Sequence, residues 1–168
     1  MHKKIPFILA TLSMVGGIFI AILFGVNEEM FLNKIEKDLN QNPKIMQILD
    51  ETKRAEKISS EKDKNWRYYQ RFHFHATAIG SMSIAILLLL NFMAAPTKLI
   101  TLNSWLIGLG GFLYPIVWLM AALYGPIMGR HEAKEAFKIF AFGGGAYLVG
   151  LVLLVFLIIK YPLKLKNA

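Results

Sequence analysis

The fold is decided first by residues 5–26, which read IPFILATLSMVGGIFIAILFGV and contain no charged side chain. A helix of this length reaches about 33 Å, which is enough to cross the hydrocarbon core of a bilayer. Lys3 and Lys4 precede the run, and Glu28 and Glu29 follow it. A cleaved signal peptide also has a basic start, but its apolar region is shorter and a small-residue cleavage site follows it. We therefore expect a retained membrane-spanning helix.

Three further apolar runs follow, at about 72–95, 99–124 and 136–159, and each is bounded by proline, glycine or charged residues. Because the connections between these three runs are short, the spans are expected to be antiparallel neighbours. The sequence therefore predicts an all-α integral membrane protein, an antiparallel four-helix transmembrane bundle. Residues 1–168 are expected to form one domain.

The segment between the first two spans, residues 27–71, is polar and is expected to be a helical extramembrane insert. Phe31, Ile35 and Leu39 recur at four-residue steps, which is one face of an amphipathic helix. Asn42 can cap a second helix that begins with a proline.

A third insert helix is expected to begin near Ser60, which can form a weak capping pair with Asp63. Neither glycine nor proline occurs between Ser60 and Ile79. This helix is therefore expected to continue without interruption into the second span.

Small residues recur along the apolar runs at helical spacing. In lipid, small residues hold helices together because they let backbones approach closely. Gly17 and Gly108 are therefore expected at close helix–helix contacts. The rows are Ser13, Gly17, Ala21 and Gly25 in the first span and Ser104, Gly108 and Gly111 in the third.

The chain carries a net charge of +8 and contains no cysteine. Its lysines and arginines lie between and beside the apolar runs, where they meet lipid headgroups. There is no arginine-rich face interleaved with exposed aromatic side chains, so nucleic acid is not an expected partner. The expected partners are the lipid bilayer and either other membrane-protein subunits or further copies of this chain.

Two signals for orientation disagree. The basic start before Glu28 favours a cytoplasmic N-terminus, whereas the insert holds ten of the lysines and arginines. The first helix usually sets the orientation. We therefore expect both termini in the cytoplasm and the insert on the other side of a bacterial-type plasma (inner) membrane.

Histidines are the main chemical signal. His73 and His75 open the second span, and His131 lies between the third and the fourth. Two crossings separate His75 from His131, so these residues share one side of the membrane. Residues two apart on a helix diverge by about 200°. Because His73 shares a face with Thr77 and Gly80, we expect His73 to point into the bundle towards His131, and His75 to face lipid headgroups or another helix.

Three interpretations of these histidines stay open. His73 and His131 are candidate axial ligands of a haem b. Alternatively, His73, His131 and Glu135 are candidate ligands of a divalent metal ion. The third interpretation is that they are interfacial histidines and that no cofactor binds.

The function expected from these features is that of a small accessory or binding subunit of a membrane complex, with a haem or metal at the histidine layer. A structural or assembly protein without a cofactor is the alternative, and a small membrane enzyme is a third. No catalytic residue is assigned, because no phosphate loop, nucleophile elbow or complete zinc-protease motif occurs. The central parts of the spans hold no ionisable side chain, which argues against a proton-coupled transporter or pump.

Overall fold

The computed structural model describes residues 4–163, and within that range its regular structure is helical. The predicted class, all-helical with four long apolar helices, is confirmed, because four helical segments are long and apolar enough to cross a membrane. The residues Lys3, Lys164 and Lys166, which bear on orientation, lie outside the described range. The elements are α1 (Lys4–Asn40), α2 (Pro43–Met46), α3 (Glu51–Asn91), α4 (Thr97–Met128), α5 (Arg130–Ala136), the 3₁₀ helix η1 (Lys138–Ala141) and α6 (Phe142–Lys160).

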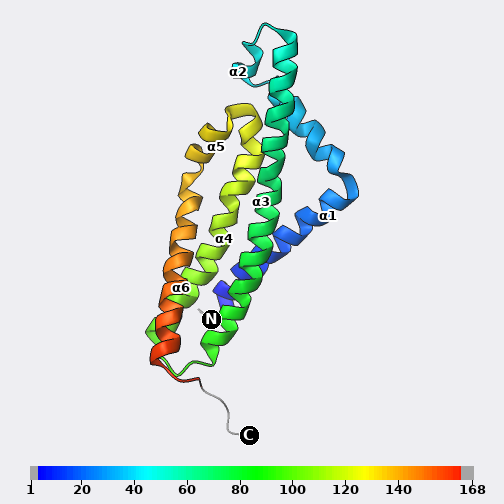
Figure 1. The fold of residues 1–168 in the computed structure, drawn as a ribbon. Coiled ribbons are helices and arrows are strands. Elements are labelled where there is room, and N and C mark those ends of the chain that lie inside the picture. The colour runs from blue at the N-terminus through cyan, green and yellow to red at the C-terminus, as the bar shows by residue number, and fades with distance from the viewer. Residues whose placement is uncertain (1–3, 164–168) are drawn as a thin grey trace.

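The first apolar run and the first insert helix form one bent helix, α1. The bend is at Asn27, whose backbone leaves the helical region with φ −158° and ψ 80°. Its side-chain oxygen accepts a hydrogen bond from the Met30 amide at 3.0 Å, so Asn27 caps the second half of α1. Figure 1 shows α1 crossing α3, bending away and returning to α3 near α2. The return buries Phe31, Ile35 and Leu39, as their spacing predicted.

The third insert helix is continuous with the second span, as predicted, but its predicted start is wrong. The helix α3 begins at Glu51, more than two turns before Ser60, because Asp50 caps it. The Asp50 carboxylate accepts a hydrogen bond from the Lys53 amide at 3.0 Å. The predicted cap of α2 is confirmed, since the Asn42 side chain accepts from the Lys44 amide.

The helix ends around the last connection also differ from the prediction. The helix α4 continues past Gly125 and includes Pro126, and it ends at Met128. Gly129 then turns the chain with φ of 101°, a conformation that favours glycine. After α5, the chain forms η1 before α6 begins at Phe142. The last connection is therefore itself helical.

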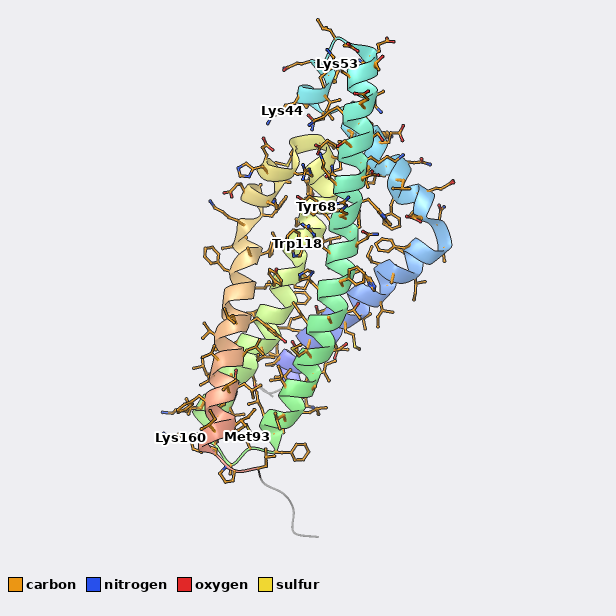
Figure 2. All side chains as sticks on the ribbon, viewed as in Figure 1. Lys44, Lys53, Tyr68, Met93, Trp118 and Lys160 are labelled. Carbon is orange, nitrogen blue, oxygen red and sulfur yellow. The ribbon has the colours of Figure 1, made fainter. Side chains whose placement is uncertain are left out.

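The helix α4 lies at the centre of the fold and contacts α1, α3 and α6. At one end, the amide of Ala94 in the α3–α4 connection donates to the carbonyl of Pro162 after α6, at 2.9 Å. At the other end, α5 and the insert meet. Figure 2 shows Lys44 and Lys53 at the insert end and Met93 and Lys160 at the opposite end.

Glycines mark the closest contacts between the helices. A Cβ added to Gly80 on α3 would lie 2.6 Å from the backbone nitrogen of Met14 on α1. One added to Gly108 on α4 would lie 2.6 Å from Cα of Pro6, and one added to Gly17 would lie 2.7 Å from the Thr77 nitrogen. The predicted close contacts at Gly17 and Gly108 are therefore confirmed, and this packing holds α1 directly against both α3 and α4.

Candidate functional site

The polar and charged contacts between distant parts of the chain gather where the insert meets the α4–α5 connection. One of them joins Arg130 on α5 to Glu61 on α3, with 2.7 Å between the guanidinium Nε and the carboxylate Oε2. Lys57 and Lys64 each lie 3.3 Å from the other carboxylate oxygen. The Glu61 side chain is only 12% exposed, so solvent screens these contacts less than it screens a surface pair.

These contacts decide the charge state of Glu61. Burial alone would raise the pKa of its carboxyl group. Hydrogen bonds from Arg130 and Lys64, together with the charge of Arg130 and a hydrogen bond from Lys57, outweigh burial and lower that pKa to about 2. Glu61 is therefore ionised throughout the physiological pH range.

Two further contacts tie the insert to the same connection. The Asn42 side chain donates to the carbonyl oxygen of Pro126 at 2.8 Å, and the Lys44 ammonium pairs with the Glu132 carboxylate. Asn42 is buried. Together with the pair of Glu61 and Arg130, these contacts hold the insert as a fixed layer across the end of α4.

His73 points into the protein, as predicted, but towards α1. Its Nδ1 lies 2.8 Å from the carbonyl oxygen of Gly17, and its ring packs edge-on against Phe24 at 6.3 Å. The predicted stripe that includes Thr77 and Gly80 does form a protein-facing surface, and its partner is α1. The expectation that this stripe turns His73 towards His131 is therefore wrong.

His75 faces α4. Its ring lies 5.3 Å from that of Tyr114 and 5.8 Å from that of Trp118, both on α4. Its Nδ1 lies 2.8 Å from the carbonyl oxygen of Arg71. Of the two predicted environments, lipid headgroups or another helix, His75 has the second.

The structure does not bring the candidate ligands into one cavity. His131 is exposed and lines two neighbouring cavities, of about 300 Å³ and about 270 Å³, and His73 lines neither of them. Glu135 pairs with Lys138 at 3.2 Å. Within residues 4–163, no three histidine or carboxylate side chains are grouped closely enough to hold a metal ion. The haem and metal hypotheses stay predictions that a spectrum and a metal analysis can decide.

Below the ion pairs lies a layer of aromatic and cationic side chains. The rings of Tyr68 and Trp118 are 5.7 Å apart, and the Arg71 guanidinium lies 5.0 Å from the Trp118 ring and 5.6 Å from the Tyr68 ring. Lys134 approaches the Tyr68 ring at 6.0 Å. Aromatic rings with cations at one depth are typical of a lipid headgroup region.

The insert also exposes two apolar side chains between the end of α2 and the start of α3. Leu49 is 95% exposed and Met46 is 60% exposed, and the two follow each other closely at the end of α2. We call this pair the apolar tip. Figure 1 shows α2 beyond the ends of α4 and α6, so lipid does not cover the apolar tip if these helices span the bilayer.

Three residues at this end of the molecule were not singled out from the sequence. Glu61, Asn65 and Tyr68 all line the larger cavity, and Asn65 is fully buried. The sequence does contain a pattern that indicates Asn65. Asn65, Tyr68 and Phe72 recur at helical spacing, so a polar side chain lies on the same helix face as two aromatic ones. A buried asparagine in such a position is expected to have a specific partner.

No protein-family model, curated protein sequence or solved structure matches this chain.

Proposed function

We propose that this chain is an accessory subunit of a membrane complex that crosses the bilayer four times and recognises a partner protein through its extramembrane insert. Three features support the antiparallel arrangement. Four helical segments have the required length and apolarity. Ala94 and Pro162 meet at one end of the bundle, and Glu61 and Arg130 meet at the other.

The apolar tip is the observation that carries the proposal. An apolar side chain that is fully exposed to water gains roughly 1.5–3 kcal/mol when a partner buries it. Leu49 and Met46 lie on a layer that is held to α4 and α5 by a hydrogen bond and ion pairs. A surface that is already ordered loses less conformational entropy on binding. The fixed insert is therefore suited to recognition.

Site-specific photo-crosslinking in the native membrane tests this proposal. A photoreactive residue at Leu49 should give one discrete adduct with a partner protein. A residue at Glu56, which is exposed on α3, is the matched control and should give none. Leu49→Ser combined with Met46→Ser should abolish co-purification of the same partner without lowering the amount of protein in the membrane. An equal adduct pattern from Leu49 and Glu56, or no adduct from Leu49, would overturn the proposal.

A further inference from the structure

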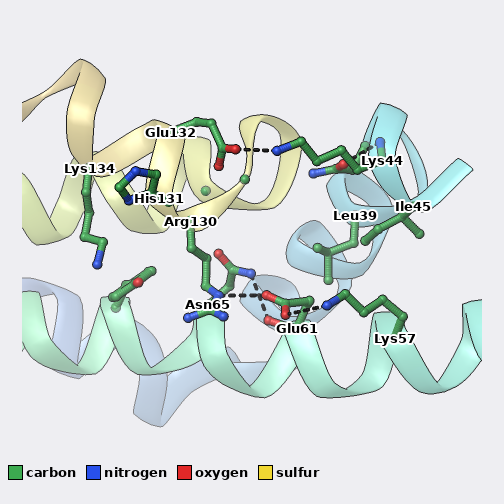
Figure 3. Close-up of a pocket in the computed structure, with 14 residues that line it drawn as sticks. Leu39, Lys44, Ile45, Lys57, Glu61, Asn65, Arg130, His131, Glu132 and Lys134 are labelled. Atoms are coloured by element: carbon green, nitrogen blue, oxygen red, sulfur yellow. Dashed lines mark hydrogen bonds and ion pairs between the residues drawn. The ribbon is translucent and has the colours of Figure 1, made fainter. Parts of the chain in front are cut away.

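A cavity of about 300 Å³ lies between the insert, α3 and the α4–α5 connection, and it does not include the apolar tip. This volume is at the lower end of the range for small-molecule sites. Figure 3 shows its side chains converging from all three walls. Its lining includes Glu61, Asn65, Tyr68, Gly125, Arg130 and Lys134.

The cavity has an excess of positive charge. Its lining holds four lysine or arginine side chains and two carboxylates, which leaves a formal charge of +2 with His131 neutral. Both carboxylates already accept from cations, Glu61 from Arg130 and Glu132 from Lys44. Lys134 has an aromatic ring nearby, at 6.0 Å, and no carboxylate partner among the described residues. An anion would balance this charge.

Asn65 adds a requirement for a hydrogen-bond donor. The side chain is fully buried, and its Nδ2 donates to the carbonyl oxygen of Glu61 at 2.8 Å. Its Oδ1 has no partner within residues 4–163. Exchanging the two amide atoms would place an oxygen against the Glu61 carbonyl, so the assignment is determined by the contact itself. A buried acceptor without a donor destabilises the folded chain.

Glycine makes room for this acceptor. A Cβ at Gly125 would lie 2.7 Å from Asn65 Oδ1, so any other residue there would displace the Asn65 side chain. In Figure 3 the Asn65 side chain extends from α3 towards the α4–α5 connection, beside Arg130 and Glu61. The unpaired oxygen and the cations therefore belong to one cavity.

We propose that this cavity binds a phosphate group that is accompanied by a hydroxyl. The phosphate oxygens accept from Lys134 and Arg130, and the hydroxyl donates to Asn65. Inorganic phosphate meets this requirement at neutral pH because it keeps at least one protonated oxygen. The headgroup of phosphatidylglycerol also meets it, with a phosphodiester and free hydroxyls. The layer of Tyr68 and Trp118 directly beside the cavity places the site at headgroup depth.

Isothermal titration of the full chain in a neutral detergent tests the proposal. The probes are inorganic phosphate, sulfate, and short-chain phosphatidylglycerol with phosphatidylcholine as its control. Sulfate has a similar shape and charge but no hydroxyl at neutral pH, so it should bind at least 10-fold more weakly than phosphate, because it leaves Asn65 unpaired. Phosphatidylcholine, which has no net charge and no headgroup hydroxyl, should not bind.

Two variants assign the binding to this cavity. Lys134→Gln removes the cation without a carboxylate partner and should weaken binding about 10-fold. Arg67→Gln is the matched control, since Arg67 is exposed on α3 and does not line the cavity; this variant should bind as the unmodified chain does. Asn65→Leu should remove the preference for phosphate over sulfate. If the Asn65→Leu variant does not fold, the binding affinity of Lys134→Gln tests the proposal instead.

The outcomes also identify the source of the phosphate. Tighter binding of phosphatidylglycerol, which then displaces inorganic phosphate, identifies a lipid headgroup. Binding of inorganic phosphate that phosphatidylglycerol does not displace identifies a free phosphate compound. No binding of either probe at millimolar concentration, or equal binding by the Lys134→Gln and Arg67→Gln variants, would overturn the proposal.

Discussion

The guanidinium Nε of Arg130 lies 2.7 Å from Oε2 of Glu61, although 69 positions separate the two residues in the chain. This ion pair joins the connection between α4 and α6 to the part of α3 that lies outside its apolar run. Because both side chains are partly buried, removing one partner should cost more than it does at an exposed ion pair. With Lys44 and Glu132, it is one of two ion pairs that join the insert to α5.

Glu61→Gln should loosen the insert without unfolding the bundle. The substitution leaves Arg130 half-buried without a carboxylate, and we expect a cost of about 1–3 kcal/mol, between the values for exposed and buried pairs. Trypsin should therefore cleave at Lys44 and Lys53 several-fold faster than in the unmodified chain. Glu56→Gln, at an exposed position on the same helix, should cleave at the unmodified rate. Equal rates in all three proteins would show that the pair does not hold the insert.

Acid should loosen the same contact. The pKa of Glu61 in the folded chain, about 2, lies below the ordinary value of 4.5, so the folded state binds fewer protons. The stabilisation is therefore fully present above about pH 4.5 and is lost as the pH falls towards 2. Spin labels at Gln47→Cys and Glu135→Cys, in a chain that has no other cysteine, should report a broader distance distribution at pH 3 than at pH 7.

The Glu61→Gln variant provides the control for the acid experiment. Its distance distribution should already be broad at pH 7 and should change less with acid. The remaining change would come from Glu132, whose pKa is also lowered, by the hydrogen bond from Lys44. A distribution that responds equally to acid with and without Glu61 would contradict the assignment.

The glycine contacts predict a contrast between substitutions. Gly108→Leu forces a side chain against Pro6, and Gly17→Leu forces one against Thr77. Each should lower stability in detergent by at least about 1–3 kcal/mol, the usual cost of overpacking. Gly145→Leu is the matched control, because nothing lies within 4 Å of its Cβ position. It should be neutral or slightly stabilising, since leucine favours a helix over glycine. Equal thermal stability of Gly108→Leu and Gly145→Leu would contradict the helix packing.

The sequence was sufficient to predict the four long helices and their close contacts, because apolar runs and small-residue rows are local patterns. It also placed the cap at Asn42 and the buried face of Phe31, Ile35 and Leu39 correctly. The sequence was insufficient to predict which helix the His73 side chain faces. Short connections indicated α4 as the neighbour of α3, whereas the glycine stripe of α3 packs on α1. The partner of a face depends on where a distant helix crosses, and periodicity does not contain that information.

The cavity residues were missed for a similar reason. In the sequence, Glu61 and Asn65 are ordinary polar residues of an insert helix. Their importance comes from contacts with Arg130 of α5 and Gly125 near the end of α4. The start of α3 was placed late because the Ser60 and Asp63 pair looked like a cap, while Asp50 caps the helix in the structure. Sequence patterns that resemble a helix cap are more frequent than helix starts. Which of two such patterns caps the helix depends on the rest of the folded chain.

The separation of the histidines predicts a colourless protein. His73 contacts α1 and lines neither cavity that holds His131, so the two imidazoles are not placed to share one haem. The absorption spectrum of the purified chain in detergent should therefore lack a Soret band. A Soret band that is lost in His73→Ala and in His131→Ala, but kept in His75→Ala, would instead establish the haem site predicted from the sequence.

The central claim is that four helices cross the membrane and place the insert and α5 on one face. Because the chain contains no cysteine, single cysteines can be labelled from either side of sealed vesicles with an impermeant maleimide. Gln47→Cys in the insert and Glu135→Cys in α5 should be labelled from the same side, and Lys98→Cys in the first turn of α4 from the opposite side. Labelling of Lys98→Cys and Gln47→Cys from the same side would contradict the account, because α3 would then not cross the membrane.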